Sequence, residues 1–263
     1  RIENADSTDL ANVATTFNNM ADTILSDIEK IKSVDQLRQE LIANISHDLR
    51  TPLAVVQGYI ETLHMKNAQL SLKEQQEYLN IISSGGDRLA KLISQLFEYS
   101  KLESNQIQPK KEPFLISELA NDINRNYSIL AKNKNIDLKL SMDDNIPLVF
   151  ADISLVERAV QNLMDNAIKF TPEFGEIIIK VKALETGVEV VVQDSGPGID
   201  KESQVLIFER FRQTRIGREK EGAGLGLAIV KKILDIHDSK ITVLSNPNSG
   251  TKFSFELPIY NVI

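Results

Sequence analysis

The sequence predicts a multidomain protein: long helices over about the first hundred residues, then an α+β domain. Three observations predict this division. Apolar residues repeat three or four positions apart as far as Leu102, a charged segment with a proline (KKEPF) follows at residues 110–114, and short apolar strands then alternate with amphipathic helices. With 263 residues, of which 42% are hydrophobic, the chain is long enough to bury a core.

The N-terminal part is predicted to be an all-α helical hairpin that dimerises. Its first helix carries an apolar stripe with the spacing of a coiled coil: Leu10, Val13, Phe17, Met20 and Ile24. A second helix is expected from about Lys73 to Glu103, and the polar residues 66–72 suit a short connection. A long helix with a narrow apolar stripe cannot bury that stripe alone, so we expect two hairpins to pair as a four-helix bundle. The glycine pair at 85–86 is expected to bend the second helix.

The C-terminal part is predicted to be a mixed sheet with helices on one face, and KKEPF is predicted to be a linker. Amphipathic helices are expected at about residues 117–134, 154–170 and 223–237, with a hairpin turn at 185–187. The expected strands are IDLKL, PLVF, EIIIKVKAL, VEVVVQD, KITVLS and TKFSFEL.

Composition excludes several classes of protein. A net charge of -7 argues against general nucleic-acid binding, and the absence of cysteine excludes disulfides and cysteine-ligated metal sites. No apolar run approaches the length of a membrane span, and the N-terminus lacks the apolar region of a signal peptide. We therefore expect these residues to be soluble as given. Because the chain begins abruptly in a helical pattern, we also expect it to be a fragment.

One predicted helix carries polar residues that suit a metal and phosphate site. In NLMDNAIKF (residues 162–170), Asn162, Asn166 and Lys169 project from one side, and the opposite side is apolar. Amide oxygens can ligate Mg²⁺, and a lysine one turn on can contact phosphate. A solvated polar face is the alternative that these residue types leave open.

Two glycine-rich segments suggest a ligand site. In DSGPGI (residues 194–199), Asp194 ends a strand and its carboxylate can accept a hydrogen bond from the amino group of adenine, although a tight turn with an ordinary aspartate cap is the alternative. GAGLGLAIV (residues 222–230) opens a helix, whose exposed amides attract anions. No strand precedes it, so the Rossmann fingerprint does not fit. The segment 200–221 is expected to be a mobile lid pinned by Phe208 and Phe211.

Taken in order, these segments resemble those of bacterial two-component sensor histidine kinases. ISHDLRTPL (residues 45–53) resembles the phosphoacceptor box, NLMDNAIKF the N box, DSGPGI the G1 box, IFERF (residues 207–211) the F box and GAGLGLAIV the G2 box. DSTDLANVATTFNNMA resembles the second helix of a HAMP relay domain. The resemblance implies a partial HAMP helix and signalling coiled coil at 1–30, a HisKA-type dimerisation and phosphotransfer hairpin at 31–108, and a catalytic domain of the Bergerat (GHKL) ATP-binding fold at 109–263.

The resemblance also implies roles for individual residues in the first helix. His47 would attack the γ-phosphoryl group of ATP, and the adjacent Asp48 would accept or orient a proton on its ring. Thr51, one turn later, would position a water that removes phosphate from the aspartate of a partner. Pro52 is expected to kink the helix beside this site.

In the ATP-binding domain, the resemblance implies that Asn166 ligates Mg²⁺ with support from Asn162, that Lys169 contacts phosphate, and that Asp194 contacts adenine. Arg212 is the preferred phosphate-contacting arginine, with Arg210 and Arg215 as alternatives. The glycines expected to shape the pocket and its lid are Gly196, Gly198, Gly222, Gly224 and Gly226.

The resemblance predicts a homodimeric histidine kinase that uses ATP and Mg²⁺, passes its phosphoryl group to an aspartate of a response regulator and also dephosphorylates that regulator. It also implies that a membrane-spanning sensor precedes this portion in the chain and that this portion lies on the cytoplasmic side of the membrane. The chain departs from the family pattern at Asp48, Gln213 and Ala223. The last two motivate one alternative, a dimeric scaffold or phosphatase with a degenerate nucleotide site. An ATPase of the gyrase or Hsp90 kind is disfavoured because Asn162 occupies the position of their catalytic glutamate.

The two remaining histidines are predicted to have structural roles. His64 and His237 each lie near the end of a predicted helix, where a cation or a cap is favoured.

Overall fold

A computed structural model describes residues 8–66, 70–104, 106–210 and 224–260. The chain forms two compact units, residues 1–54 and 55–263. Helix α1 (Thr8–Lys66) accounts for the described part of the first unit and continues into the second. In the part of the chain that the structure describes, no helix is long and apolar enough to cross a membrane.

In the first unit, α1 exposes the apolar stripe that the sequence predicts. Phe17, Met20 and Ile24 of that stripe are exposed in the single chain, as is Ile28 one turn later. The helix is continuous on both sides of Pro52, so the expected kink does not end it.

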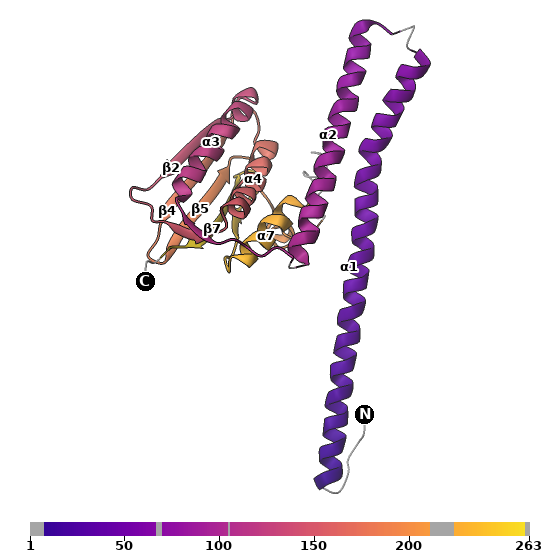
Figure 1. The fold of residues 1–263 in the computed structure, drawn as a ribbon, viewed down its shortest axis with the longest axis vertical. Coiled ribbons are helices and arrows are strands. Elements are labelled where there is room, and N and C mark those ends of the chain that lie inside the picture. Colours follow the sequence, from indigo (N-terminus) through magenta and orange to yellow (C-terminus); the bar gives the residue numbers. More distant parts are fainter. Residues whose placement is uncertain (1–7, 67–69, 105, 211–223, 261–263) are drawn as a thin grey trace. The chain divides into compact units, whose positions relative to one another are not determined.

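In the second unit, the end of α1 and helix α2 (Leu72–Glu103) confirm the predicted helical hairpin (Figure 1). The rings of Tyr59 and Tyr78 meet edge to face, 5.0 Å apart. Ser71 and Glu74 form a capping box that explains why α2 begins there: the Ser71 N–H donates to Glu74 Oε2 at 2.8 Å, and the Glu74 N–H donates to Ser71 Oγ at 3.3 Å. The glycine pair at 85–86, where a bend was expected, does not interrupt α2.

A five-stranded mixed sheet forms the centre of the C-terminal part. Its strands are β2 (Asp137–Met142), β4 (Glu176–Ala183), β5 (Gly187–Asp194), β7 (Thr251–Pro258) and β6 (Thr242–Ser245), in that spatial order. Strand β2 is parallel to β4, and the other neighbours are antiparallel. The predicted mixed sheet and the hairpin turn between β4 and β5 are therefore confirmed.

A separate two-stranded sheet differs from the prediction. Glu112–Phe114, within the segment predicted to be a linker, forms β1 and pairs antiparallel with β3 (Val149–Ala151). PLVF therefore contributes to this small sheet and not to the large one. In β3 the side chains of Val149 and Ala151 are buried while Phe150 is exposed, and this alternation requires a strand with backbone partners.

Three helices cover one face of the large sheet: α3 (Ile116–Asn133), α4 (Ile153–Phe170) and α7 (Gly226–Ile236) (Figure 1). Asp152 caps α4 by accepting from the N–H groups of Ser154 and Leu155. A short helix, α5 (Lys201–Leu206), follows β5. The apolar face of α4 packs against α7 and β5, which leaves the polar side of α4 to line a site.

Candidate functional site

A cavity of about 540 Å³ lies in the second unit, where α4, the start of α7, the end of β5 and α2 come together. Seven of the residues singled out from the sequence line it: Asn162, Asn166, Lys169, Asp194, Gly198, Gly224 and Gly226. These residues come from three motifs that are distant in the chain. The fold therefore brings the N, G1 and G2 segments together around one space.

The polar side of α4 supplies one wall of this cavity. Asn162 is buried, and its Nδ2 group donates to the carbonyl oxygen of Arg158 at 2.9 Å, so its Oδ1 atom is free of that bond. A Cβ atom built on Gly226 would lie 3.2 Å from Asn162 Oδ1, so a larger residue there would require the Asn162 side chain to shift by a few tenths of an ångström. The ammonium group of Lys169 lies 4.7 Å from the ring centre of Phe170. This wall of the site thus presents the side-chain amides of Asn162 and Asn166 with the ammonium group of Lys169 beside them.

Asp194 lies at the end of β5, where the backbone of the following turn holds its carboxylate. Its Oδ1 atom accepts from the Gly196 N–H at 2.8 Å. Burial raises the pKa of Asp194 above its ordinary value, and backbone hydrogen bonds from Gly196 and Thr251 partly oppose that effect. A desolvated carboxylate with fixed geometry is a strong acceptor for an amino group.

Close backbone contacts explain the glycines around Asp194. Gly196 does not line the cavity, and its contribution is the N–H group that orients Asp194. Gly198 has φ +72°, and a Cβ atom there would overlap the carbonyl oxygen of Asn246. Gly250, which the sequence reading missed, has φ +76°, and a Cβ atom there would overlap the carbonyl oxygen of Asp194 itself. The Asn-Ser-Gly turn before β7 was the available signal.

The sequence reading also missed three further groups of lining residues, of which the first is Tyr127, Leu130 and Lys134 at α3. Thr251 and Phe253 line the cavity from β7, and their spacing of two places them on one face of that strand. Helix α2, which was interpreted only as a dimerisation helix, lines the cavity with Asp87, Arg88, Lys91, Leu92 and Gln95. No local pattern in α2 indicates this second role.

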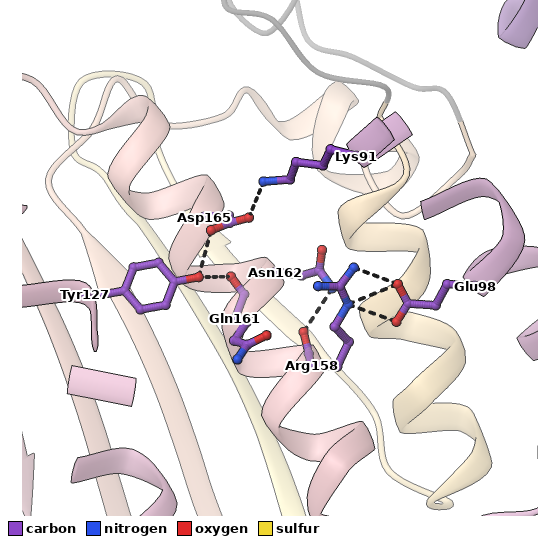
Figure 2. A network of polar contacts seen from close by, with 7 residues as sticks. All are labelled: Lys91, Glu98, Tyr127, Arg158, Gln161, Asn162 and Asp165. Atoms are coloured by element: carbon purple, nitrogen blue, oxygen red, sulfur yellow. Dashed lines mark hydrogen bonds and ion pairs between the residues drawn. The ribbon is translucent and has the colours of Figure 1, made fainter. Parts of the chain in front are cut away.

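A polar network connects α2, α3 and α4 beside the cavity (Figure 2). The Tyr127 hydroxyl lies 2.7 Å from Asp165 Oδ1, to which it donates, and Lys91 Nζ lies 2.8 Å from Asp165 Oδ2. Arg158 donates to both carboxylate oxygens of Glu98 at 2.7–3.0 Å. Burial, reinforced by the hydrogen bond to Asp165, raises the pKa of Tyr127, which therefore remains a hydroxyl donor. Asp165 is thus held from two sides, next to Asn166.

The segment expected to be a lid is placed only at its start. Phe208 packs edge to face on Phe253, with ring centres 6.2 Å apart. Arg210 pairs with Glu103 at 3.1 Å, and its guanidinium group lies 5.5 Å from the ring centre of Tyr99, whose pKa is raised by burial to about 12. Arg210 therefore contacts α2. The other predicted residues of the segment, Phe211, Arg212 and Arg215, lie outside the described residues, as does Gly222 just after it, and their roles remain predictions.

The predicted phosphoacceptor residues belong to the first unit. His47 lies within α1, but its side chain is outside the described part of the structure. On the same helix Asp48 is partly buried and Thr51 is exposed.

Of the two remaining histidines, His237 has the structural role that the sequence predicts, and the role of His64 stays a prediction. His237 is buried at the end of α7, where its Nδ1 atom lies 2.7 Å from the Ile233 carbonyl oxygen and its Nε2 atom accepts from the Asp152 N–H at 3.0 Å. This pattern requires the neutral ring, and burial correspondingly lowers the pKa of His237. His64 is exposed in the last turn of α1.

Comparisons with known proteins agree with this geometry. Two family models match: His Kinase A (phospho-acceptor) domain over residues 37–105, and Histidine kinase-, DNA gyrase B-, and HSP90-like ATPase over residues 151–261. Drug sensory protein A of Synechocystis sp. is 35% identical over 247 residues, which cover 90% of this chain and 37% of that protein.

Two solved structures of histidine kinases are also similar. Full-length ShkA in complex with AMPPNP gives a TM-score of 0.64 at 30% identity, covering 85% of this chain and 46% of that one. ThkA in complex with the response regulator protein TrrA gives a TM-score of 0.69 at 30% identity, covering 84% and 61%. The chain thus spans only part of the length of these relatives. With the cavity formed by the N, G1 and G2 segments, the matches show that the chain belongs to the sensor histidine kinase family and contains its phosphoacceptor and ATP-binding domains.

Proposed function

We propose that this chain is an ATP-dependent protein histidine kinase that phosphorylates itself on His47 and passes the phosphoryl group to an aspartate of a response regulator. One observation carries the proposal. Asn162, Asn166 and Lys169 from α4 share a cavity with Asp194 from β5, in a chain whose α1 helix bears the phosphoacceptor motif. The proposed domains are a HAMP fragment and coiled coil at 1–30, the phosphotransfer hairpin at 31–108, and the ATP-binding domain at 109–263.

The chemistry of the cavity suits ATP. Asp194 would accept from the adenine amino group, because a carboxylate in a partly desolvated setting binds a donor strongly. Lys169 would contact the phosphates and Asn166 their metal ion. The ShkA structure, which contains AMPPNP, supports an adenine nucleotide as the ligand.

The residues present also suit Mg²⁺. Within the described ranges, no group of three or more His, Cys, Asp or Glu side chains could hold a metal ion alone. Mg²⁺ in nucleotide sites usually has few protein ligands and shares its other positions with phosphates and water, so the Asn166 amide oxygen, supported by Asn162, is an adequate protein contribution. The ion would neutralise charge on the phosphates during transfer.

The proposed reaction needs little covalent chemistry from the protein. A ring nitrogen of His47 attacks the γ-phosphorus, the bond between that phosphorus and the β,γ-bridging oxygen breaks, and ADP leaves with the electron pair. The adjacent Asp48 accepts the ring proton. The contributions of Lys169 and Asp194 are orientation and charge stabilisation. The phosphoryl group then moves to the carboxylate of a response regulator, a partner class supported by the ThkA–TrrA complex.

A second activity, dephosphorylation of the same regulator, is favoured by the position of Thr51. This residue is exposed on α1 four positions after His47, so it lies on the same helical face as His47 and would orient a water there. Thr51→Ala should preserve labelling of His47 but slow the release of phosphate from a phosphorylated regulator. Equal loss of both activities would contradict a separate role.

The exposed apolar side chains of both long helices support a homodimer. Six of them are Phe17, Ile24, Leu53, Ile60, Leu79 and Phe97. We expect two copies to cover Phe17 and Ile24 in the coiled coil and the other four residues in a four-helix bundle of the two hairpins. A sensor anchored in the membrane would precede this portion and place it at the cytoplasmic face.

Autophosphorylation is the direct test of the proposed function. Incubation with γ-labelled ATP and Mg²⁺ should give a label that is stable in alkali and labile in acid. His47→Gln should abolish it, whereas His64→Gln, on the same helix, should retain it. An acid-stable label, or one that persists in His47→Gln, would refute the assignment.

A further inference from the structure

A row of three polar side chains crosses neighbouring strands where Asp194 lines the cavity. Asp194 of β5 lies directly opposite Thr251 of β7, and Thr251 lies directly opposite Ser245 of β6. Residues directly opposite each other in a sheet project from the same face. Asp194 and Thr251 line the cavity, whereas Ser245 does not. The row therefore joins two residues of the cavity to one outside it.

The hydroxyl group of Ser245 has three partners, which fill its hydrogen-bonding capacity. It accepts from the Ile199 N–H at 2.8 Å. It also lies 2.6 Å from the carbonyl oxygen of Gly250 and 3.0 Å from Thr251 Oγ1. A carbonyl oxygen can only accept, so the single hydrogen of the Ser245 hydroxyl is donated to Gly250. The Thr251 hydroxyl must then be the donor in its bond to Ser245, because the opposite direction would leave two acceptors facing each other at Gly250.

A glutamine of α5 holds the backbone on both sides of this hydroxyl. Gln204 Nε2 donates to the carbonyl oxygen of Ser245 at 2.8 Å and to that of Ile199 at 2.7 Å. These two bonds tie the start of α5 to β6 and keep the Ile199 N–H directed at Ser245 Oγ. The direction of the Thr251 O–H bond is thus set by groups that do not belong to the ligand.

This direction determines what Thr251 can offer to a ligand in the cavity. With its hydrogen directed at Ser245, Thr251 Oγ1 can only accept. The Asp194 carboxylate is also an acceptor, and the N–H groups of Gly196 and Thr251 already donate to it. An amino group has two hydrogens and suits two acceptors. A carbonyl oxygen would meet lone pairs instead and would leave a buried acceptor unpaired.

We propose that Ser245 is a positioning residue for base selection: by holding the Thr251 hydroxyl as an acceptor, it makes the cavity prefer a purine with an amino group at C6 over one with an oxygen there. The proposal rests on the proposed kinase function and adds a residue outside the cavity to it. Asp194 alone discriminates less, because a 6-oxopurine also has a donor, its N1–H group, beside the oxygen. A second fixed acceptor leaves that oxygen without a partner.

The test compares ADP with inosine diphosphate (IDP), which differ only at the N1–C6 edge of the base. Calorimetric titration of the wild type should give a Kd for IDP about hundredfold above the Kd for ADP, because unpaired acceptors in a buried site are costly. In Ser245→Ala the Thr251 hydroxyl loses its acceptor and can donate to the 6-oxygen. The ratio of the two Kd values should therefore fall about tenfold, mainly through tighter binding of IDP.

The ratio separates base selection from a general loss of structure, which would weaken both nucleotides equally. Ser245→Thr retains a hydroxyl group and should retain the wild-type ratio. Thr242→Ala is the matched control, since Thr242 and Ser254 form a similar hydroxyl pair at 2.7 Å between the same two strands but outside the cavity. This variant should also keep the wild-type ratio.

A wild-type ratio in Ser245→Ala would overturn the positioning role. If Ser245→Ala fails to fold, Thr251→Val decides, because it removes the oriented hydroxyl itself. ADP binding should then weaken about tenfold with little change for IDP, and an equal loss for both would overturn the role. Wild type that binds ADP with the expected ratios but does not label His47 would overturn the kinase function alone. Wild type that binds no ADP would overturn both.

Discussion

Replacing Asp194 by asparagine should weaken nucleotide binding without lowering stability. Burial raises the pKa of this carboxyl group in the folded state. A carboxyl group with a raised folded pKa contributes stability below its unfolded pKa, and that contribution is lost as the pH rises through the folded pKa. At neutral pH the ionised side chain is therefore a cost to folding. Asparagine removes the charge, and its Oδ1 atom still accepts from the Gly196 N–H.

The expected loss of affinity follows from the hydrogen bond to adenine. A hydrogen bond to a charged group contributes about 1.5–3 kcal/mol. Each 1.4 kcal/mol corresponds to about tenfold in Kd, so Asp194→Asn should weaken ADP binding roughly ten- to hundredfold. The stability change should have the opposite sign or be close to zero.

Calorimetric titration with ADP and a thermal unfolding scan at pH 7.5 would measure the two effects. Glu189→Gln, on the same strand and paired with Lys252, should change neither value appreciably. An unchanged Kd would refute the role of Asp194 in adenine binding. A marked fall in Tm would refute the inference that its charge is a cost to the folded state.

Three further predictions concern the supports of the site. Burial lowers the pKa of His237 in the folded state, so below about pH 6.5 the unfolded chain binds a proton that the folded chain does not. The free energy of unfolding should therefore fall with decreasing pH, by up to about 1.4 kcal/mol per pH unit. Urea titrations should show a weaker pH dependence of this free energy in His237→Gln than in wild type. Gly226→Ala should weaken ADP binding about tenfold by crowding Asn162, at a cost below about 1 kcal/mol in stability, and an unchanged Kd would contradict that contact. Gly250→Ala should lower the free energy of unfolding by about 1–3 kcal/mol or more, because the φ of Gly250 is +76°. Gly58→Ala should raise that free energy in the same urea titrations, because Gly58 lies in α1 with open space around it.

Local periodicity explains which parts of the site the sequence could predict. In α4 the apolar positions alternate with Asn162, Asn166 and Lys169 at helical spacing, so one segment encodes both the buried face and the face that lines the cavity. Strand β5 is equally clear, because a run of valines ends at Asp194 and a glycine turn. These features lie within one or two turns of each other and need no knowledge of distant partners.

Features that depend on distant pairing were missed. Strand β1 has three residues, too few for any period, and it becomes a strand only because β3, more than thirty residues later, supplies its backbone partners. Gly250 is required by the carbonyl group of Asp194, which lies on a neighbouring strand. The Asn-Ser-Gly sequence indicates a turn at Gly250, but it does not show which backbone approaches that glycine.

The contact between α2 and α4 is the strongest case of this kind. Read alone, Lys91 and Glu98 belong to an ordinary solvated helical face, and so do Arg158 and Asp165. A spacing of seven is common in any amphipathic helix, so the match between the two faces acquires meaning only once the fold sets the helices side by side in opposite directions. The exposed pair alone would stabilise the contact little. Together with the Glu98–Arg158 pair, the Lys91–Asp165 pair disfavours the registers in which α2 is shifted by two turns along α4, since either shift would bring like charges together. The register that remains places α2 beside the residues proposed to hold the phosphates.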